Sequence, residues 1–132
     1  MFEQSDPHEW LRFAQEDLAA AQLLVTVAEL PARMACFHAQ QAAEKALKAS
    51  LMHAAIHFRK THDLVVLVAL QPEPVRSEAG NLDLQRLQQW AADARYPADL
   101  PDITAGEVVA VVAIADQIVA VVATALRTNG PA

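Results

Sequence analysis

Alanine is the residue that most constrains the fold of this chain, because it occurs 28 times in 132 residues while glycine occurs only three times. Alanine has the highest helix propensity of the common residues, whereas a sandwich of short strands needs many glycine-rich turns. Hydrophobic residues make up 54% of the chain, which excludes intrinsic disorder. A chain of this length holds one hydrophobic core. We therefore expect a single helical domain over residues 1–132, with an ordered core of about residues 7–127.

Five segments combine helical spacing of apolar residues with signals that start a helix. Residues that suit these starts are Asp6 with Pro7, Thr61, Asn81, and the pair Thr104 and Glu107, which has capping-box spacing. The predicted helices run from Pro7 to Ala28, from Pro31 to Ala55, from Thr61 past Val68, from Asn81 to about Ala94, and from Thr104 to about Leu126. Proline and glycine place loops at residues 71–80 and 95–102. The pattern predicts an all-α, up-and-down bundle of four to five helices.

The last predicted helix has an apolar stretch, Val108–Leu126, that is long enough to cross a membrane. Asp116 and Gln117 lie at its centre, and no basic cluster flanks it. We therefore expect it at the centre of a bundle or in a dimer interface, with no membrane contact. The N-terminus is acidic and lacks the basic start and apolar core of a secretory signal, so we expect a cytoplasmic protein.

The single cysteine, Cys36, excludes a disulfide framework and a multi-cysteine zinc site. It falls among alanines on the second predicted helix, so we expect a packed thiol. His53 and His57 have the i, i+4 spacing of metal ligands, but no strong third ligand is evident. We therefore expect both histidines to be exposed and the chain to bind no metal.

Charge is distributed unevenly along the chain. The net charge of −6 disfavours nonspecific binding to a nucleic-acid backbone. Residues 31–62 nevertheless hold five basic residues against one acid, a net charge of +4, and four of the five histidines. This basic island is either a solvated helix face or a binding surface for a negatively charged ligand.

A helical wheel of the second predicted helix separates two faces at about 100° per residue. One wide face carries small packing residues, namely Ala35, Cys36, Ala39, Ala42, Ala43, Ala46, Leu47, Ala49 and Ser50. Beside it, a polar stripe spans about 80° and consists of His38, Gln41, Lys45 and Lys48. Two ammonium groups, an imidazole and an amide all donate hydrogen bonds, which suits a phosphate or a nucleotide. A solvated face is the alternative interpretation.

The run from Cys36 to Ala49, CFHAQQAAEKALKA, resembles the signature of the HEPN family, the higher eukaryotes and prokaryotes nucleotide-binding domain. Three shorter elements are similar to the family in order and spacing. They are Trp10 followed by AQEDL at 14–18, THDL at 61–64 and RYP at 95–97. With the central run, they extend the resemblance from Trp10 to about Leu126.

This resemblance implies a helical bundle that forms a homodimer. It also implies, as in many members, a small nucleotidyltransferase as partner in a toxin–antitoxin pair. A bound nucleotide such as ATP or GTP is implied more firmly than catalysis, and no other cofactor is implied. The nucleotide- or RNA-phosphate-binding residues would be Asp17, His38, Gln41, Lys45, Lys48, His62, Arg95 and Tyr96. Structural roles are the alternative for each, such as pairing of Asp17 with Lys45 or Arg95.

The ribonuclease branch of the family carries an arginine, then four to six residues, then a histidine. A tyrosine often stands two residues after this histidine. Arg33 and His38 match this spacing. His38 would transfer the proton and Arg33 would stabilise the charged phosphorane. However, the two side chains lie about 140° apart on the wheel, and Gln40 replaces the tyrosine. We therefore expect a non-catalytic, nucleotide-binding accessory domain, with a metal-independent ribonuclease toxin and a structural interaction module as alternatives.

Overall fold

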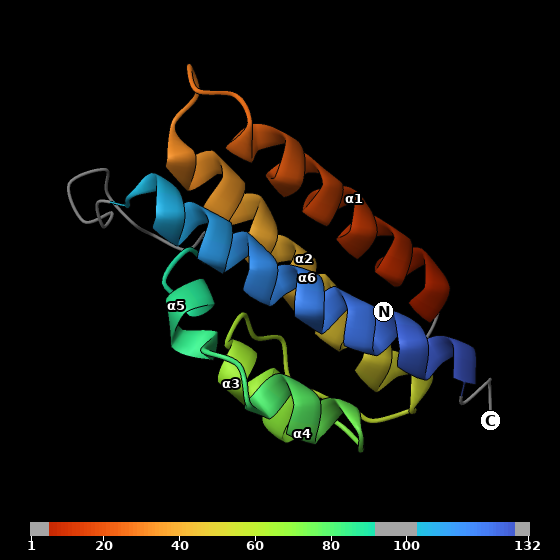
Figure 1. Cartoon of the computed structure of the whole chain (residues 1–132). Helices are drawn as coiled ribbons and strands as arrows, with labels where there is room; N and C mark the ends of the chain where they lie inside the picture. Colours follow the sequence, from red (N-terminus) through yellow and green to blue (C-terminus); the bar gives the residue numbers. More distant parts are fainter. Residues whose placement is uncertain (1–5, 92–102, 129–132) are drawn as a thin grey trace.

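The computed structural model describes residues 6–91 and 103–128 and is all-helical over these ranges. Its helices are α1 (Pro7–Val25), α2 (Ala32–His53), α3 (Leu64–Ala69), α4 (Val75–Gly80), α5 (Leu84–Gln88) and α6 (Ala105–Thr128). The three long helices α1, α2 and α6 lie side by side, and the short helices α3, α4 and α5 gather along one side of them (Figure 1). The predicted all-α bundle is confirmed, with six helices in the described ranges.

Helix α1 begins where the sequence predicts and ends three residues early. The Asp6 side chain accepts a hydrogen bond from the backbone N–H of His8 at 2.8 Å, and Pro7 occupies the first helical position. At the other end, the backbone N–H of Thr26 bonds to the carbonyl of Leu23 at 2.9 Å. This tighter i to i−3 bond closes the last turn before the predicted end at Ala28.

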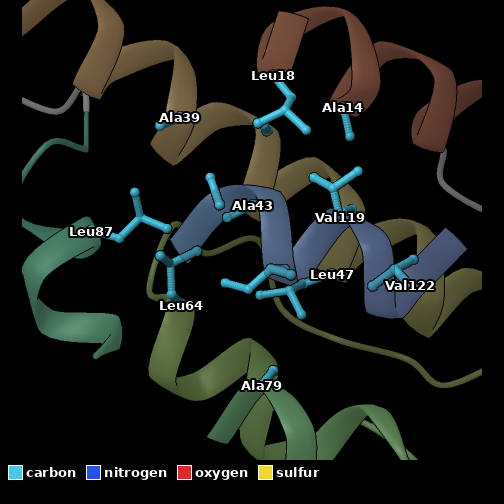
Figure 2. Close-up of a cluster of buried hydrophobic side chains, with 14 of the residues drawn as sticks. Ala14, Leu18, Ala39, Ala43, Leu47, Leu64, Ala79, Leu87, Val119 and Val122 are labelled. Atoms are coloured by element: carbon cyan, nitrogen blue, oxygen red, sulfur yellow. The ribbon is translucent and has the colours of Figure 1, made fainter. Parts of the chain in front are cut away.

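Helix α2 is the central helix of the bundle. Every member of the predicted small-residue face is buried, from Ala35 to Ser50. The alanines present little bulk, so α1 and α6 approach α2 from two sides, with Leu18 of α1 and Val119 of α6 reaching the same cluster (Figure 2). Each well-packed methylene contributes about 0.8 kcal/mol of transfer free energy, so this continuous core holds the three helices together.

Three predictions about the short helices are wrong. The segment predicted as a loop at 71–80 contains α4, because Pro72 and Pro74 precede the helix, where a missing N–H costs nothing. The N-cap of α3 is Asp63 and not Thr61. The Asp63 carboxylate accepts from the backbone N–H of Val65 at 2.9 Å, whereas Thr61 Oγ1 accepts from the backbone N–H of Asp63 at 3.1 Å. The cap of α5 is Asp83 and not Asn81. Leu84, Leu87 and Ala91 of the predicted stripe are buried, while Ala94 and the predicted loop at 95–102 lie outside the described residues.

The predicted capping box opens α6. Thr104 Oγ1 accepts from the backbone N–H of Glu107 at 3.2 Å, and Glu107 Oε1 accepts from that of Thr104 at 3.3 Å. Within the described ranges, α6 is the one helix long and apolar enough to cross a membrane, with a mean hydropathy of 2.3. One face of it packs on α1 and α2, and the other leaves Val109 and Asp116 exposed.

Candidate functional site

Asp17 of α1 links two residues of the predicted polar stripe on α2. Its Oδ1 lies 2.9 Å from His38 Nδ1, and its Oδ2 lies 2.6 Å from Lys45 Nζ. His38 and Lys45 are seven residues apart, which places them on the same face of the helix. Their side chains are 33% and 31% exposed, against 14% for Asp17. The three residues, called the Asp17 cluster below, therefore form a polar group open to solvent on the outside.

The bond to Asp17 fixes the orientation of the His38 ring. An ionised carboxylate only accepts hydrogen bonds, so Nδ1 of His38 carries the hydrogen in this pair. The remaining ring nitrogen, Nε2, then acts as an acceptor in the neutral ring and as a donor in the protonated ring. Lys45 uses one of its three N–H donors on Asp17. Both side chains thus keep capacity for a further polar partner.

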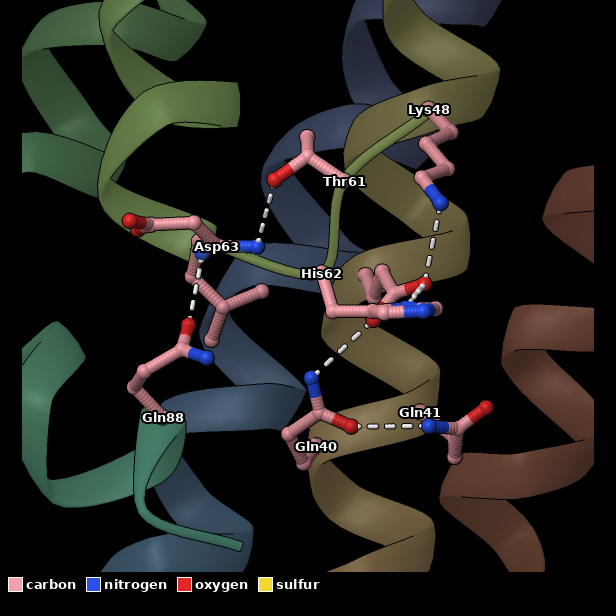
Figure 3. A network of polar contacts seen from close by, with 9 residues as sticks. Gln40, Gln41, Lys48, Thr61, His62, Asp63 and Gln88 are labelled. Atoms are coloured by element: carbon pink, nitrogen blue, oxygen red, sulfur yellow. Dashed lines mark hydrogen bonds and ion pairs between the residues drawn. The ribbon is translucent and has the colours of Figure 1, made fainter. Parts of the chain in front are cut away.

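Glu44 is the centre of a second, more buried polar group. Its Oε1 accepts from Gln40 Nε2 at 3.1 Å, and its Oε2 accepts from Lys48 Nζ at 3.0 Å and from the ring of His62 at 2.9 Å (Figure 3). The side chains of Glu44 and Lys48 are only 7% and 6% exposed. These four residues, called the Glu44 cluster below, attach the segment before α3 to the middle of α2.

The titration of Glu44 is governed by competing influences. Burial alone would raise the pKa of this carboxyl group. Hydrogen bonds from His62, Lys48 and Gln40, together with the positive charge of Lys48, outweigh burial and hold the pKa below its ordinary value. Glu44 is therefore ionised at neutral pH, and the buried charge is compensated inside the protein.

Gln41 connects to the Glu44 cluster through a relay of amides. Its Nε2 donates to Oε1 of Gln40 at 2.8 Å, and Gln40 donates in turn to Glu44 (Figure 3). Gln41 is half-buried on the same helix face as His38 and Lys45. Its amide keeps one N–H donor beyond the bond to Gln40.

The structure divides the predicted binding residues between the two clusters. Asp17, His38 and Lys45 come together, Lys48 and His62 both bond to Glu44, and Gln41 reaches Glu44 only through Gln40. Arg95 and Tyr96 lie outside the described residues. Both ammonium groups of the stripe are paired with carboxylates, and Lys48 is buried where the wheel predicted an open stripe. His62, from the segment before α3, bonds to the same Glu44 oxygen as Lys48, a contact that a single-helix projection does not show.

Two participants were missed by the sequence reasoning. Glu44, the one acid of residues 31–62, was given no role, and Gln40 was noted only because it stands in the place of a tyrosine. The available signal was spacing, because Gln40, Glu44 and Lys48 follow one another at i, i+4 and can form successive side-chain pairs.

In the predicted catalytic pair of Arg33 and His38, only His38 has a polar side-chain contact shown by the structure, and that contact is with Asp17. Arg33 is exposed in the first turn of α2, and His38 pairs with Asp17 rather than with Arg33. The second neighbour of the His38 ring is Phe37, at 5.3 Å between ring centroids. Any proton transfer by His38 would therefore be supported by Asp17 and Lys45.

Cys36 is buried, as predicted, and burial together with the negative charge of Glu107 raises its pKa to about 11.

The prediction that His53 is exposed is wrong, because its ring stacks edge-on against His8 at 6.0 Å and its Nε2 is buried without a partner. His57 is exposed as predicted. In the part of the chain that the structure describes, no three His, Cys, Asp or Glu side chains gather as a metal site.

Comparison with known proteins identifies the fold and its relatives. The HEPN domain model matches residues 7–125. The crystal structure of ST0689, an archaeal HEPN homologue, has a TM-score of 0.70 and 22% identity over 92% of this chain and 98% of its own. The crystal structure of TT1696 from Thermus thermophilus has a TM-score of 0.70 and 27% identity over 89% of this chain and 96% of its own. Among curated proteins, none matches.

Proposed function

This chain belongs to the HEPN domain family, and we propose on that basis that it is a nucleotide-binding accessory domain acting beside a small nucleotidyltransferase. The observation that carries the binding proposal is the Asp17 cluster. It places an imidazole and an ammonium group on one helix face, each about a third exposed and each with unused hydrogen-bonding capacity. The ammonium group of Lys45 has two further N–H donors for phosphate oxygens, and Nε2 of His38 donates to them when the ring is protonated.

Three residues of the predicted set are suited to touch the ligand. Lys45 supplies charge to a phosphate, and His38 and Gln41 supply directional hydrogen bonds. The candidate ligand is a nucleotide such as ATP or GTP. Lys48 and His62 do not touch the ligand in this proposal, because both bond to Glu44. Their role is to hold the adjoining surface in place.

The partner proposal has separate support. The motif from Cys36 to Ala49 resembles HEPN proteins that pair with a minimal nucleotidyltransferase, several of them as toxin and antitoxin. We extend the same proposal to a homodimer, and the exposed face of α6 around Val109 offers apolar area for self-association. Sedimentation equilibrium of the purified protein tests the dimer, and a single monomeric species would refute it.

Calorimetric titration with ATP and GTP tests nucleotide binding. We expect saturable binding by the wild type and its loss in Lys45→Ala. Lys60→Ala is the matched control, because Lys60 is an exposed lysine of the loop before α3 and lies outside both clusters. Equal affinity of all three proteins would show that the ligand does not lie on Lys45, and no binding by any of them would refute the proposal.

A second candidate function, a metal-independent ribonuclease, is favoured by one contact. Asp17 holds Nδ1 of His38, so Nε2 is left free for proton transfer, and Lys45 can stabilise charge on a phosphate in place of Arg33. Cleavage of structured RNA that is lost in His38→Ala, with growth arrest on expression, would support this function. Intact RNA and normal growth would exclude it.

A further inference from the structure

The two carboxylates that face the polar stripe of α2 differ in how firmly they are enclosed. Glu44 is surrounded by three donors and is 7% exposed, and its ammonium partner Lys48 is 6% exposed. Asp17 has two donors, and both of them, His38 and Lys45, keep about a third of their side-chain surface in solvent. An external anion can therefore reach both donors of Asp17, whereas the ammonium donor of Glu44 is closed to solvent and its one open donor is His62, at 52% exposed.

Asp17 presents its two oxygens as an anionic ligand would. One oxygen accepts from His38 Nδ1 at 2.9 Å and the other from Lys45 Nζ at 2.6 Å. A single carboxylate thus bridges an imidazole and an ammonium group across the surface between α1 and α2. This bridging contact is the one that two oxygens of a phosphate group make with a pair of cationic donors.

We infer that Asp17 is a built-in competitor for the anion site, so a bound phosphate group must displace its carboxylate or share its donors. The inference rests on the proposed nucleotide-binding function and adds the regulation of that site. It also narrows the ligand class to anions that carry more than one charge. A free, singly charged carboxylate would bind the two donors no more tightly than the Asp17 side chain does. Asp17 is part of the chain and loses no translational freedom when it binds them.

The competitor is weak enough to be displaced. The Asp17–Lys45 pair is partly buried, and solvent reaches its ammonium end, which is 31% exposed, so screening weakens the ion pair in part. Pyrophosphate and the triphosphate of a nucleotide carry several negative charges and offer more acceptor oxygens than one carboxylate. They can therefore recruit His38 and Lys45 together, and Lys45 has donors left over for a second phosphate oxygen.

Calorimetric titration with inorganic pyrophosphate tests this inference on wild type, Asp17→Asn and Glu16→Gln at fixed ionic strength. The asparagine side chain is uncharged and nearly isosteric with aspartate, so we expect Asp17→Asn to bind pyrophosphate about three- to fivefold more tightly than wild type. Glu16→Gln is the control for the loss of one charge on α1, because Glu16 pairs with Arg12 and is 62% exposed. Its affinity should match the wild type. Asp17→Ser is the second variant should Asp17→Asn lack the helical circular dichroism of the folded protein.

The outcomes separate the inference from the proposed function. Binding of ATP that depends on Lys45, together with unchanged or weaker pyrophosphate binding in Asp17→Asn, overturns the competitor role and leaves nucleotide binding intact. Tightening in Glu16→Gln as large as in Asp17→Asn also overturns it, because the effect would then be one of overall charge. Absence of ATP and pyrophosphate binding in every protein refutes both.

Discussion

Replacing Lys48 by methionine is the perturbation whose effect on stability follows most directly from the structure. Lys48 and Glu44 are 6% and 7% exposed and lie 3.0 Å apart. Removal of one partner from a buried ion pair leaves an uncompensated charge, which costs about 3–5 kcal/mol. Gln40 and His62 still donate to Glu44 in the variant, so the cost falls to about 2–3 kcal/mol.

Urea unfolding followed by helical circular dichroism measures this loss. A slope of about 1–3 kcal/mol per molar urea converts the expected loss into a midpoint about 0.7–3 M lower. Lys60→Met is the matched control, because Lys60 is exposed and its replacement should change stability by less than about 0.5 kcal/mol.

A double-mutant cycle separates the charge effect from lost packing. In Glu44→Gln the unpaired carboxylate is absent, so Lys48→Met added to it should cost less than about 1 kcal/mol. The reasoning would be refuted if Lys48→Met alone behaved like Lys60→Met. It would equally be refuted if the cost of Lys48→Met were the same in the wild-type and the Glu44→Gln backgrounds.

Three further predictions concern pH, thiol chemistry and capping. Hydrogen bonds hold the pKa of Glu44 below its ordinary value, so Glu44 contributes stability above the unfolded pKa of about 4.5 that is lost as pH falls through the lower folded pKa. Urea midpoints between pH 5 and pH 2 should therefore fall less steeply in Glu44→Gln than in the control Glu78→Gln, which replaces an exposed glutamate of α4. Cys36, with a pKa of about 11, should react with a thiol reagent at pH 8 far more slowly in the native protein than in urea, and equal rates would contradict its burial. Asp63→Ala should lower stability by about 1 kcal/mol in urea unfolding, whereas Thr61→Ala should cost less; the reverse order would restore Thr61 as the cap of α3.

The long helices could be predicted from the sequence because their signals are local and repeated. Alanine spacing marked the buried face of α2, and Thr104 and Glu107 marked the start of α6. The short helices were harder, since one or two side chains decide where each begins. Asp63 accepts from two backbone N–H groups while Thr61 accepts from one, and two nearby residues with capping ability cannot be ranked from sequence alone.

The candidate site was predictable in its residue types but not in its connections. The wheel correctly grouped His38 with Lys45, and Asp17 was an expected partner of Lys45. The wheel could not show that Lys48 is buried or that His62 joins it at Glu44, because His62 comes from a different segment and its position depends on tertiary packing. Helix periodicity reports which face a residue occupies, not what another element places on it.

Nuclear magnetic resonance titration with ATP tests the central claim most directly, namely that the Asp17 cluster is a phosphate-binding surface. The account predicts saturable shifts in the imidazole signals of His38 and the ammonium signal of Lys45, with smaller shifts at Gln41. Signals from Val109 and Asp116 on the exposed face of α6 should stay unchanged. Shifts confined to α6, or no shift at His38 and Lys45 at saturating ATP, would contradict the account.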